Sequence, residues 1–108
     1  MATTAKRFAQ ALIATTVTTH YIVPAATTAI LKDLAITNTS ANSAAPRVHI
    51  VGSGLAASSA NQLIATLTIA GNFHFHDLYF QVMNVGDTLQ SVANSAVCTI
   101  HASGVELT

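Results

Sequence analysis

The sequence predicts an all-β protein, a single antiparallel β-sandwich of about seven or eight short strands with jelly-roll or immunoglobulin-like topology. Three observations lead to this prediction. The chain has 108 residues, which is enough for one compact domain. It contains 15 Thr and 17 Val plus Ile, the β-branched residues that favour strands. Turn residues recur every 8 to 12 positions or so, between runs in which apolar and polar residues alternate.

The first third of the chain is expected to contain an arm and two strands. Residues 1–9 show no packing pattern and are predicted to be an N-terminal arm, so the sandwich domain comprises residues 10–108. Residues 12–23 form one extended run that the turn Pro24-Ala25-Ala26 closes. Residues 28–38 carry apolar side chains at both alternating sets of positions, which predicts a central strand covered on both faces.

The remaining strands are shorter, and Gly, Asn, Ser or Pro separate them. Residues 38–46 and 55–61 are predicted to be loops. Strands are expected at residues 47–52, 62–69, 73–82, 88–93 and 97–102, with a possible extension at residues 105–107. The aromatic side chains of the strand at 73–82 are expected to face the core: Phe73, Phe75, Tyr79 and Phe80.

The charge content limits what the protein can bind. Four basic and four acidic residues give a net charge of zero, whereas an average domain of this size would carry about 27 charged residues. Four scattered basic residues argue against nucleic-acid binding through phosphates. No apolar run approaches the ~18 residues of a membrane span. A neutral, charge-poor surface favours association, so we expect other protein chains to cover much of it.

The segment His74-Phe75-His76 is the sharpest chemical pattern in the sequence. On a strand, His74 and His76 point to the same face and could together bind one metal ion. Asp77 points to the opposite face, and no third ligand is placed by the sequence, although His20, His49 or His101 could supply one. The simpler interpretation is that both imidazoles face solvent or a neighbouring chain, so no metal or cofactor is expected.

Other candidate chemistry is sparse. Cys98 lies inside a predicted strand and has no base on its own face, so we expect a buried, inert thiol. The four acidic residues do not form a pair at a spacing typical of acid–base catalysis. No Gly-rich phosphate-binding loop is present. The sequence therefore predicts no enzymatic activity and no catalytic residue.

Several segments suggest a family when they are taken in order. They are a Thr-rich first strand at 12–19, VPA at 23–25, ITNTS at 36–40, GDTLQ at 86–90 and SGVE at 103–106. In this order they resemble small all-β virion structural proteins of tailed bacteriophages, over nearly the whole chain. The segment His74-Phe75-His76 departs from that pattern, in which a plainer aliphatic or acidic stretch is usual.

The resemblance implies a capsid decoration (cement) protein that binds and stabilises the shell of the major capsid protein. It implies a homotrimer, a location in the virion after assembly in the host cytoplasm, and no nucleic-acid or membrane partner. The arm is then the segment expected to order on binding, with Lys6, Arg7 and Phe8 as its distinctive partner-binding residues. Two alternatives stay open: a neck, tail or fibre-attachment component, and a small β-sandwich module that binds a metal or a carbohydrate.

Overall fold

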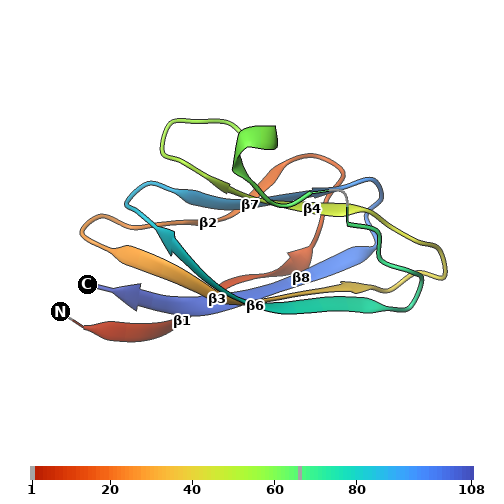
Figure 1. Ribbon diagram of the computed structural model, residues 1–108, viewed down its shortest axis with the longest axis horizontal. Helices are drawn as coiled ribbons and strands as arrows, with labels where there is room; N and C mark the ends of the chain where they lie inside the picture. Colours follow the sequence, from red (N-terminus) through yellow and green to blue (C-terminus); the bar gives the residue numbers. More distant parts are fainter. Residues whose placement is uncertain (1, 66) are drawn as a thin grey trace.

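The computed structural model describes residues 2–65 and 67–108, and these residues form eight strands and one 3₁₀ turn. The strands lie in two layers that face each other, and the two termini lie at the same end (Figure 1). The elements are β1 (Thr3–Leu12), β2 (Thr18–Ile22), β3 (Thr28–Asn38), β4 (Pro46–Val51), η1 (Ser59–Asn61), β5 (Gln62–Ile64), β6 (His74–Met83), β7 (Thr88–Ala93) and β8 (Cys98–Leu107).

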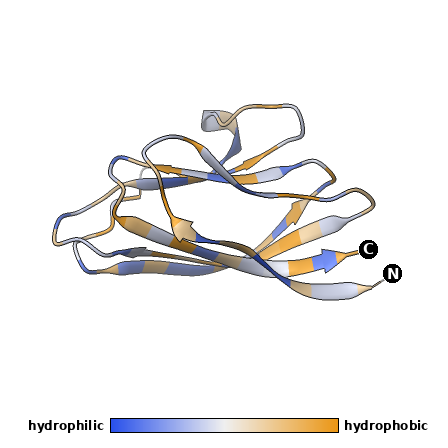
Figure 2. Ribbon diagram, turned by 180° about the vertical axis from the view of Figure 1, so that it is seen from behind, coloured by the Kyte–Doolittle hydropathy of each residue, from blue (hydrophilic) through white to orange (hydrophobic). Residues whose placement is uncertain are grey.

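The predicted antiparallel β-sandwich is confirmed, and its strand order is that of a jelly roll. The first sheet has the order β1-β8-β3-β6, and the second has the order β2-β7-β4-β5. Each of β1, β2, β3 and β4 therefore pairs with a late strand, namely β8, β7, β6 and β5. The pairs β1–β8 and β3–β6 lie in the first sheet, and the pairs β2–β7 and β4–β5 lie in the second, so successive pairs alternate between the sheets as in a jelly roll. Along the strands, hydrophobic and hydrophilic residues alternate (Figure 2).

The strand predicted at residues 28–38 is confirmed as β3, which lies between β8 and β6. Its inward residues change parity in the middle of the strand: Leu31 and Leu34 are both fully buried. The cause is a register shift between Leu31 and Asp33, which makes Lys32 an extra residue relative to β8. The bulge moves Lys32 outward and keeps apolar residues directed into the core on both sides of it.

Neighbouring strands of the first sheet shift register at the same level. Between Arg7 and Ala9, β1 has one extra residue, Phe8, relative to β8. The β8 residue at this level is Gly104, which pairs with Leu31 and lies against the backbone of Ile30. A Cβ at Gly104 would lie 1.9 Å from the Ile30 carbonyl oxygen and 2.8 Å from Phe8 Cε2. A glycine is therefore required for these strands to approach each other at the bulges.

The prediction of an N-terminal arm at residues 1–9 is wrong for residues 3–9, which belong to β1 and pair with β8. Phe8 is only 3% exposed, and its ring packs against Tyr21 of the second sheet with 4.4 Å between centroids. The Tyr21 hydroxyl donates a hydrogen bond to the Glu106 carboxylate of β8. The bulge turns the Phe8 side chain toward the core. Strict alternation of inward and outward residues along the sequence does not predict this orientation.

The long first strand expected at residues 12–23 is also wrong, because this segment crosses from one sheet to the other. β1 ends at Leu12 in the first sheet, and β2 begins at Thr18 in the second. Between them, Ile13 is fully buried, and its N–H donates to the Cys98 carbonyl. The Thr-rich run therefore contains the segment that crosses between the two sheets. Its high β-propensity does not reveal that the strand is interrupted between Leu12 and Thr18.

Buried hydrogen bonds organise the loop between β3 and β4. Asn38 is fully buried, and its amide nitrogen donates to the carbonyls of Asn42, Ile69 and Ala70 at 2.7, 3.0 and 3.3 Å. Its side-chain oxygen accepts from the backbone N–H and hydroxyl of Ser40. The Asn38 side chain, at the start of the predicted loop, thus joins this loop to the segment that contains Ile69 and Ala70.

The strand expected at residues 62–69 is shorter than predicted. β5 ends at Ile64, and Ile69 forms an isolated bridge with Ala44, while residue 66 lies outside the described residues. The predicted loop at 55–61 contains η1, which Ser58 caps by accepting a hydrogen bond from the N–H of Ala60. No helix in residues 2–65 and 67–108 is long and apolar enough to cross a bilayer.

The aromatic strand predicted at 73–82 is confirmed as β6, but its aromatic residues do not all reach the core. Phe75 and Tyr79 pack against the core, whereas Phe73 and Phe80 are 62% and 66% exposed. The expectation that Phe73 and Phe80 face the core is therefore wrong. β6 is an edge strand, Phe73 precedes it, and Phe80 lies on its outer face.

Replacing Gly104 with Ala tests the close approach at the bulges. We expect the free energy of unfolding to fall by about 2 to 3 kcal/mol, because the Ile30 backbone and the Phe8 ring must move to admit a methyl group. Urea unfolding followed by circular dichroism measures the change. The exposed neighbour Ser103, replaced with Ala, is the control and should change stability by less than about 0.5 kcal/mol. Equal stability of the two variants would contradict the packing account.

Candidate functional site

The outer face of the first sheet brings together three of the five histidines. Residues directly opposite each other on neighbouring strands share a face, and Ala35 of β3 lies between His76 of β6 and His101 of β8. His101 in turn lies opposite Gln10 of β1. His74 is two residues from His76 on the same strand, so it points to the same face. This polar half of the outer face is where the sequence pattern His74-Phe75-His76 is found.

The acidic partner of the histidines comes from β3 and not from β6. His76 Nε2 lies 2.6 Å from Asp33 Oδ1, and the two side chains are 50% and 48% exposed. Asp77, next to His76 in sequence, instead accepts a hydrogen bond from the N–H of Leu78. Asp33 was not predicted as a partner of the histidines. Asp33 could have been predicted as a partner only from the antiparallel pairing of β3 with β6, and this pairing cannot be inferred from the local sequence.

Among the described residues, the candidate metal ligands His74 and His76 are not joined by a third ligand. The His74 ring stacks on Phe73 with 5.5 Å between centroids. Of the three distal histidines considered from the sequence, His20 and His49 lie in strands of the second sheet, and His101 lies on the same face as His76 but is separated from it by Ala35 of β3. Across residues 2–65 and 67–108, no group of three or more His, Cys, Asp or Glu is arranged to hold a metal ion.

His49 occupies a structural position. It is 4% exposed, and its Nδ1 lies 3.0 Å from the Oδ1 atom of Asn61 in η1. The same Asn61 side chain accepts from the N–H of Ser58 and donates to the carbonyl of Ala56. His49 therefore helps to hold the 55–61 loop against the outer face of the second sheet.

A second polar pair lies between β2 and β7. His20 Nε2 is 2.5 Å from the hydroxyl of Ser91, and Ser91 is fully buried. Burial lowers the pKa of His20 below its ordinary value of 6.5, which favours the neutral imidazole. A nucleophilic serine must reach its substrate, and a buried hydroxyl does not. The pair joins the β2 bulge at His20 to β7.

The partner-binding residues expected from the sequence are separated by the structure. Lys6 and Arg7 are exposed on β1, whereas Phe8 belongs to the core. Arg7 and His20 line an open groove of about 420 Å³ that runs beside residues 7–11 of β1. Arg7 also borders a hollow of about 190 Å³ over the sheet, together with Asp33 and His101. Two of the three predicted residues thus remain available for contact.

The other half of the outer face is apolar and includes Phe80, which was expected in the core. On β6, Leu78, Phe80 and Val82 alternate along the outer face and are 71%, 66% and 52% exposed. Ile30 of β3 lies between Val82 and Val105 in the sheet and is 9% exposed. The Lys32 ammonium lies 5.7 Å from the centre of the Phe80 ring. The structure therefore exposes a contiguous apolar surface at the end of the sheet where β6 is the edge.

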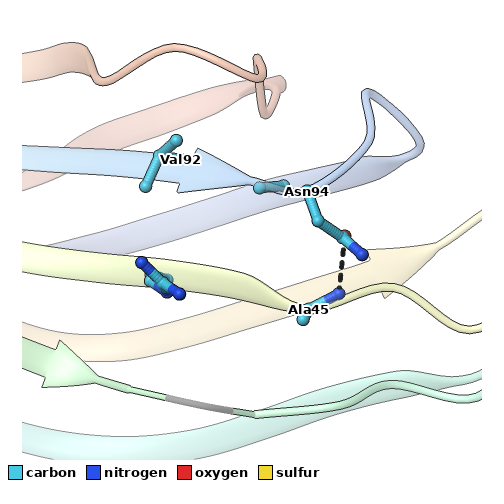
Figure 3. A pocket seen from close by; sticks show the side chains of 5 residues that line it. Ala45, Val92 and Asn94 are labelled. Atoms are coloured by element: carbon cyan, nitrogen blue, oxygen red, sulfur yellow. Dashed lines mark hydrogen bonds between the residues drawn. The ribbon is translucent and has the colours of Figure 1, made fainter.

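The second sheet carries a small hollow between β4 and β7. Its lining includes Ala45, Arg47, Val92 and Asn94, and the Asn94 side chain accepts a hydrogen bond of 2.9 Å from the Ala45 N–H (Figure 3). Its volume is about 170 Å³, below the ~300 Å³ from which small-molecule pockets usually begin. The hydrogen bond fixes the start of β4 to the end of β7.

Cys98 agrees with its prediction as a buried thiol. It is fully buried at the start of β8, and desolvation raises the pKa of its thiol. A raised pKa disfavours the thiolate, the reactive form of cysteine.

The His20–Ser91 contact predicts a pH dependence of stability. Because burial lowers the folded-state pKa of His20 below its unfolded value, the unfolded state binds the proton first as the pH falls below 6.5. The stability associated with neutral His20 is therefore complete above about pH 6.5 and is lost as the pH falls from that value through the lower folded-state pKa. The free energy of unfolding of the wild type should decrease more between pH 7.5 and 5.5 than that of His20→Gln.

Denaturant unfolding at both pH values measures this difference. His74→Gln, which removes an exposed imidazole, is the control and should follow the wild type. Parallel pH curves for the wild type and His20→Gln would show that His20 is not responsible.

Comparisons of this chain with protein-family models, with curated proteins and with solved structures found no match.

Proposed function

We propose that this protein is a non-enzymatic structural protein of a bacteriophage virion, a capsid decoration protein that binds the shell of the major capsid protein. The virion assignment rests on the ordered segments from the Thr-rich run at 12–19 to SGVE at 103–106. The observation that carries an assembly role is the exposed apolar surface of a chain with only eight charged residues. The resemblance implies a homotrimer, but the proposal requires only binding to the shell.

The exposed apolar side chains support an assembly role because a free surface of this kind is costly in water. Large apolar side chains more than half exposed occur on both sheets and in the loops, and they are Leu12, Val17, Ile22, Leu55, Phe73, Leu78, Phe80, Val82 and Val85. Contiguous apolar patches rimmed by polar groups mark protein contacts. With a net charge of zero, long-range repulsion does not oppose such contacts.

The jelly-roll fold is compatible with the proposal but does not select it. Viral coat proteins, lectins and cupins share this architecture, so the fold alone carries no function. The site chemistry favours binding over catalysis: the hydroxyl of Ser91, which contacts His20, is enclosed in the core. His76 and Asp33, in contrast, lie on an open face where they can contact another protein.

Lys6 and Arg7 on the β1 edge are the residues through which we expect the shell to be contacted. Replacing both with Ala should weaken binding to purified capsids by about tenfold or more, without loss of folding, because both side chains are exposed and Phe8 is kept. Arg47→Ala, which removes an exposed charge from β4 of the other sheet, is the matched control and should bind as the wild type does.

Cosedimentation of the labelled protein with capsids measures the affinity and the number of copies for each particle. Saturation at many copies over the whole shell supports a decoration protein. Binding confined to the single portal vertex would instead identify a neck component. A wild-type protein that does not bind capsids at all would contradict the proposal.

A further inference from the structure

The free edge of β1 combines an open groove with two basic side chains. Among the strands of residues 2–65 and 67–108, β1 pairs only with β8, so its other side has no neighbouring strand in the first sheet. The groove of about 420 Å³ runs beside residues 7–11, and Thr19 and His20 of β2 also line it. Lys6 and Arg7 are both exposed on this strand. The edge is therefore accessible to another extended chain.

Alternate backbone groups of β1 point toward this open side. Ala2 and Thr108 exchange two backbone hydrogen bonds, of 2.8 and 2.9 Å, so they form a hydrogen-bonded pair. In an antiparallel ladder such pairs alternate with non-hydrogen-bonded pairs, whose residues direct their N–H and C=O away from the partner strand. The register continues without a shift from Thr3 to Arg7, which makes Thr3, Ala5 and Arg7 residues of the second kind. These three residues offer backbone donors and acceptors to a strand beside β1.

The two basic side chains of this segment have no acidic partner within the described protein. In residues 2–65 and 67–108, neither Lys6 nor Arg7 forms an ion pair. Asp33, which borders the same hollow as Arg7, lies 2.6 Å from His76. Glu106 of β8 accepts a hydrogen bond from a tyrosine of the core. The edge is therefore basic, and its charges are free to contact a partner.

The placement of the two charges defines what would complement them. Lys6 and Arg7 are consecutive, so their side chains point to opposite faces of the sheet. A strand added beside β1 alternates in the same way, and side chains directly opposite each other have Cβ atoms about 5 Å apart. Two consecutive acidic residues on that strand would therefore place one carboxylate beside each basic side chain. The same charges repel a basic strand, which makes the edge selective.

A second copy of this chain does not supply such a strand. Its four acidic residues are isolated in the sequence, and none is next to another: Asp33, Asp77, Asp87 and Glu106. Pairing of two β1 edges would bring the basic side chains of both copies together, and like charges opposite each other destabilise a sheet. The occupant that fits this edge is therefore a segment of a different protein.

We propose that the β1 edge binds an extended segment of a partner protein that carries two consecutive acidic residues. This segment pairs with residues 3–7 as an added strand, and its carboxylates lie beside Lys6 and Arg7. The bulge at Phe8 ends the regular pairing, and the partner residues beyond it lie in the groove beside residues 7–11. The inference rests on the proposed function for the source of the segment, which is then the capsid shell.

Peptides of different charge test the proposal without capsids. The probe is a fluorescein-labelled peptide of about ten Thr and Val residues with two consecutive Glu at its centre, and fluorescence anisotropy measures its dissociation constant. The wild type should bind it about fivefold or more tightly than the same peptide with two Gln, because two opposite-charge pairs form. The peptide with two Lys should bind most weakly. Equal binding of the three peptides would overturn the proposal.

A charge exchange on the protein supplies the second arm of this test. The double variant with Lys6→Glu and Arg7→Glu should prefer the peptide with two Lys to the peptide with two Glu, a reversal that a loss of folding does not produce. Arg47→Glu, which changes an exposed charge on β4 of the other sheet, is the matched control and should keep the wild-type order. A double variant that still prefers the acidic peptide would show that this edge is not the binding site.

N-methylated peptides test whether the backbone takes part. Alternate residues of an extended peptide direct their N–H groups to opposite sides, so only one alternating set can donate to β1. Methylation of that set should abolish binding of the acidic peptide, whereas methylation of the other set should leave it unchanged. The two peptides have the same charge and composition. Equal binding of both would contradict strand addition.

Failure of this inference can be distinguished from failure of the proposed function. Capsid binding by a protein that shows no preference for the acidic peptide would overturn the inference and leave the decoration role intact. A preference for the acidic peptide without capsid binding would support the assignment of the β1 edge and contradict the virion assignment.

Discussion

The close approach of β8 to β3 at Gly104 is the constraint on which the first sheet depends. With no side chain at this point, the Ile30 carbonyl and the Phe8 ring both contact the glycine backbone closely. The bulges at Phe8 and Lys32 lie at this level, and they redirect the alternation of the two strands that flank β8. Phe8 turns inward to pack on Tyr21, and Lys32 turns outward to lie over Phe80. The close contact at Gly104 is therefore linked both to the packing of Phe8 at the end of the core and to the position of Lys32 on the outer face.

The outer face of this sheet is divided as a result. Towards one end it is polar, with His76, His101 and Asp33 within one or two strands of each other. Towards the other end it is apolar, with Phe80 and Val82 exposed at the edge. A face of this kind combines buried area with a few oriented polar groups, the composition that protein interfaces use for affinity and register. The inner face, by contrast, is mostly apolar and packs against the core, and its polar groups include the buried Asn38 and Glu106, which accepts a hydrogen bond from Tyr21.

Much of the fold was predictable from local pattern, and the errors have a common cause. β3 and β6 were located correctly because long runs of β-branched and aromatic residues between turn signals identify strands. The assignment of Phe80 to the core was wrong because Phe80 alternates to the opposite face of the strand from Phe75 and Tyr79, which pack on the core. The arm prediction was wrong for residues 3–9 because the bulge at Phe8 breaks the period that would have revealed β1. The contact of His76 with Asp33 was missed because the two residues lie 43 positions apart in the sequence, on different strands.

The sequence by itself determined that this chain is an all-β sandwich with a charge-poor surface, because strand propensity, turn residues and net charge are local or additive properties. Only the tertiary structure decided which strands form the edges of the sheets, which histidines meet an acid and which aromatic rings face solvent. These depend on strand order and on bulges, and a bulge is set by close contacts such as that of Gly104 with Ile30. Strand order, in turn, is a long-range property: β8 lies between β1 and β3 because it pairs with both, and no local segment contains that information.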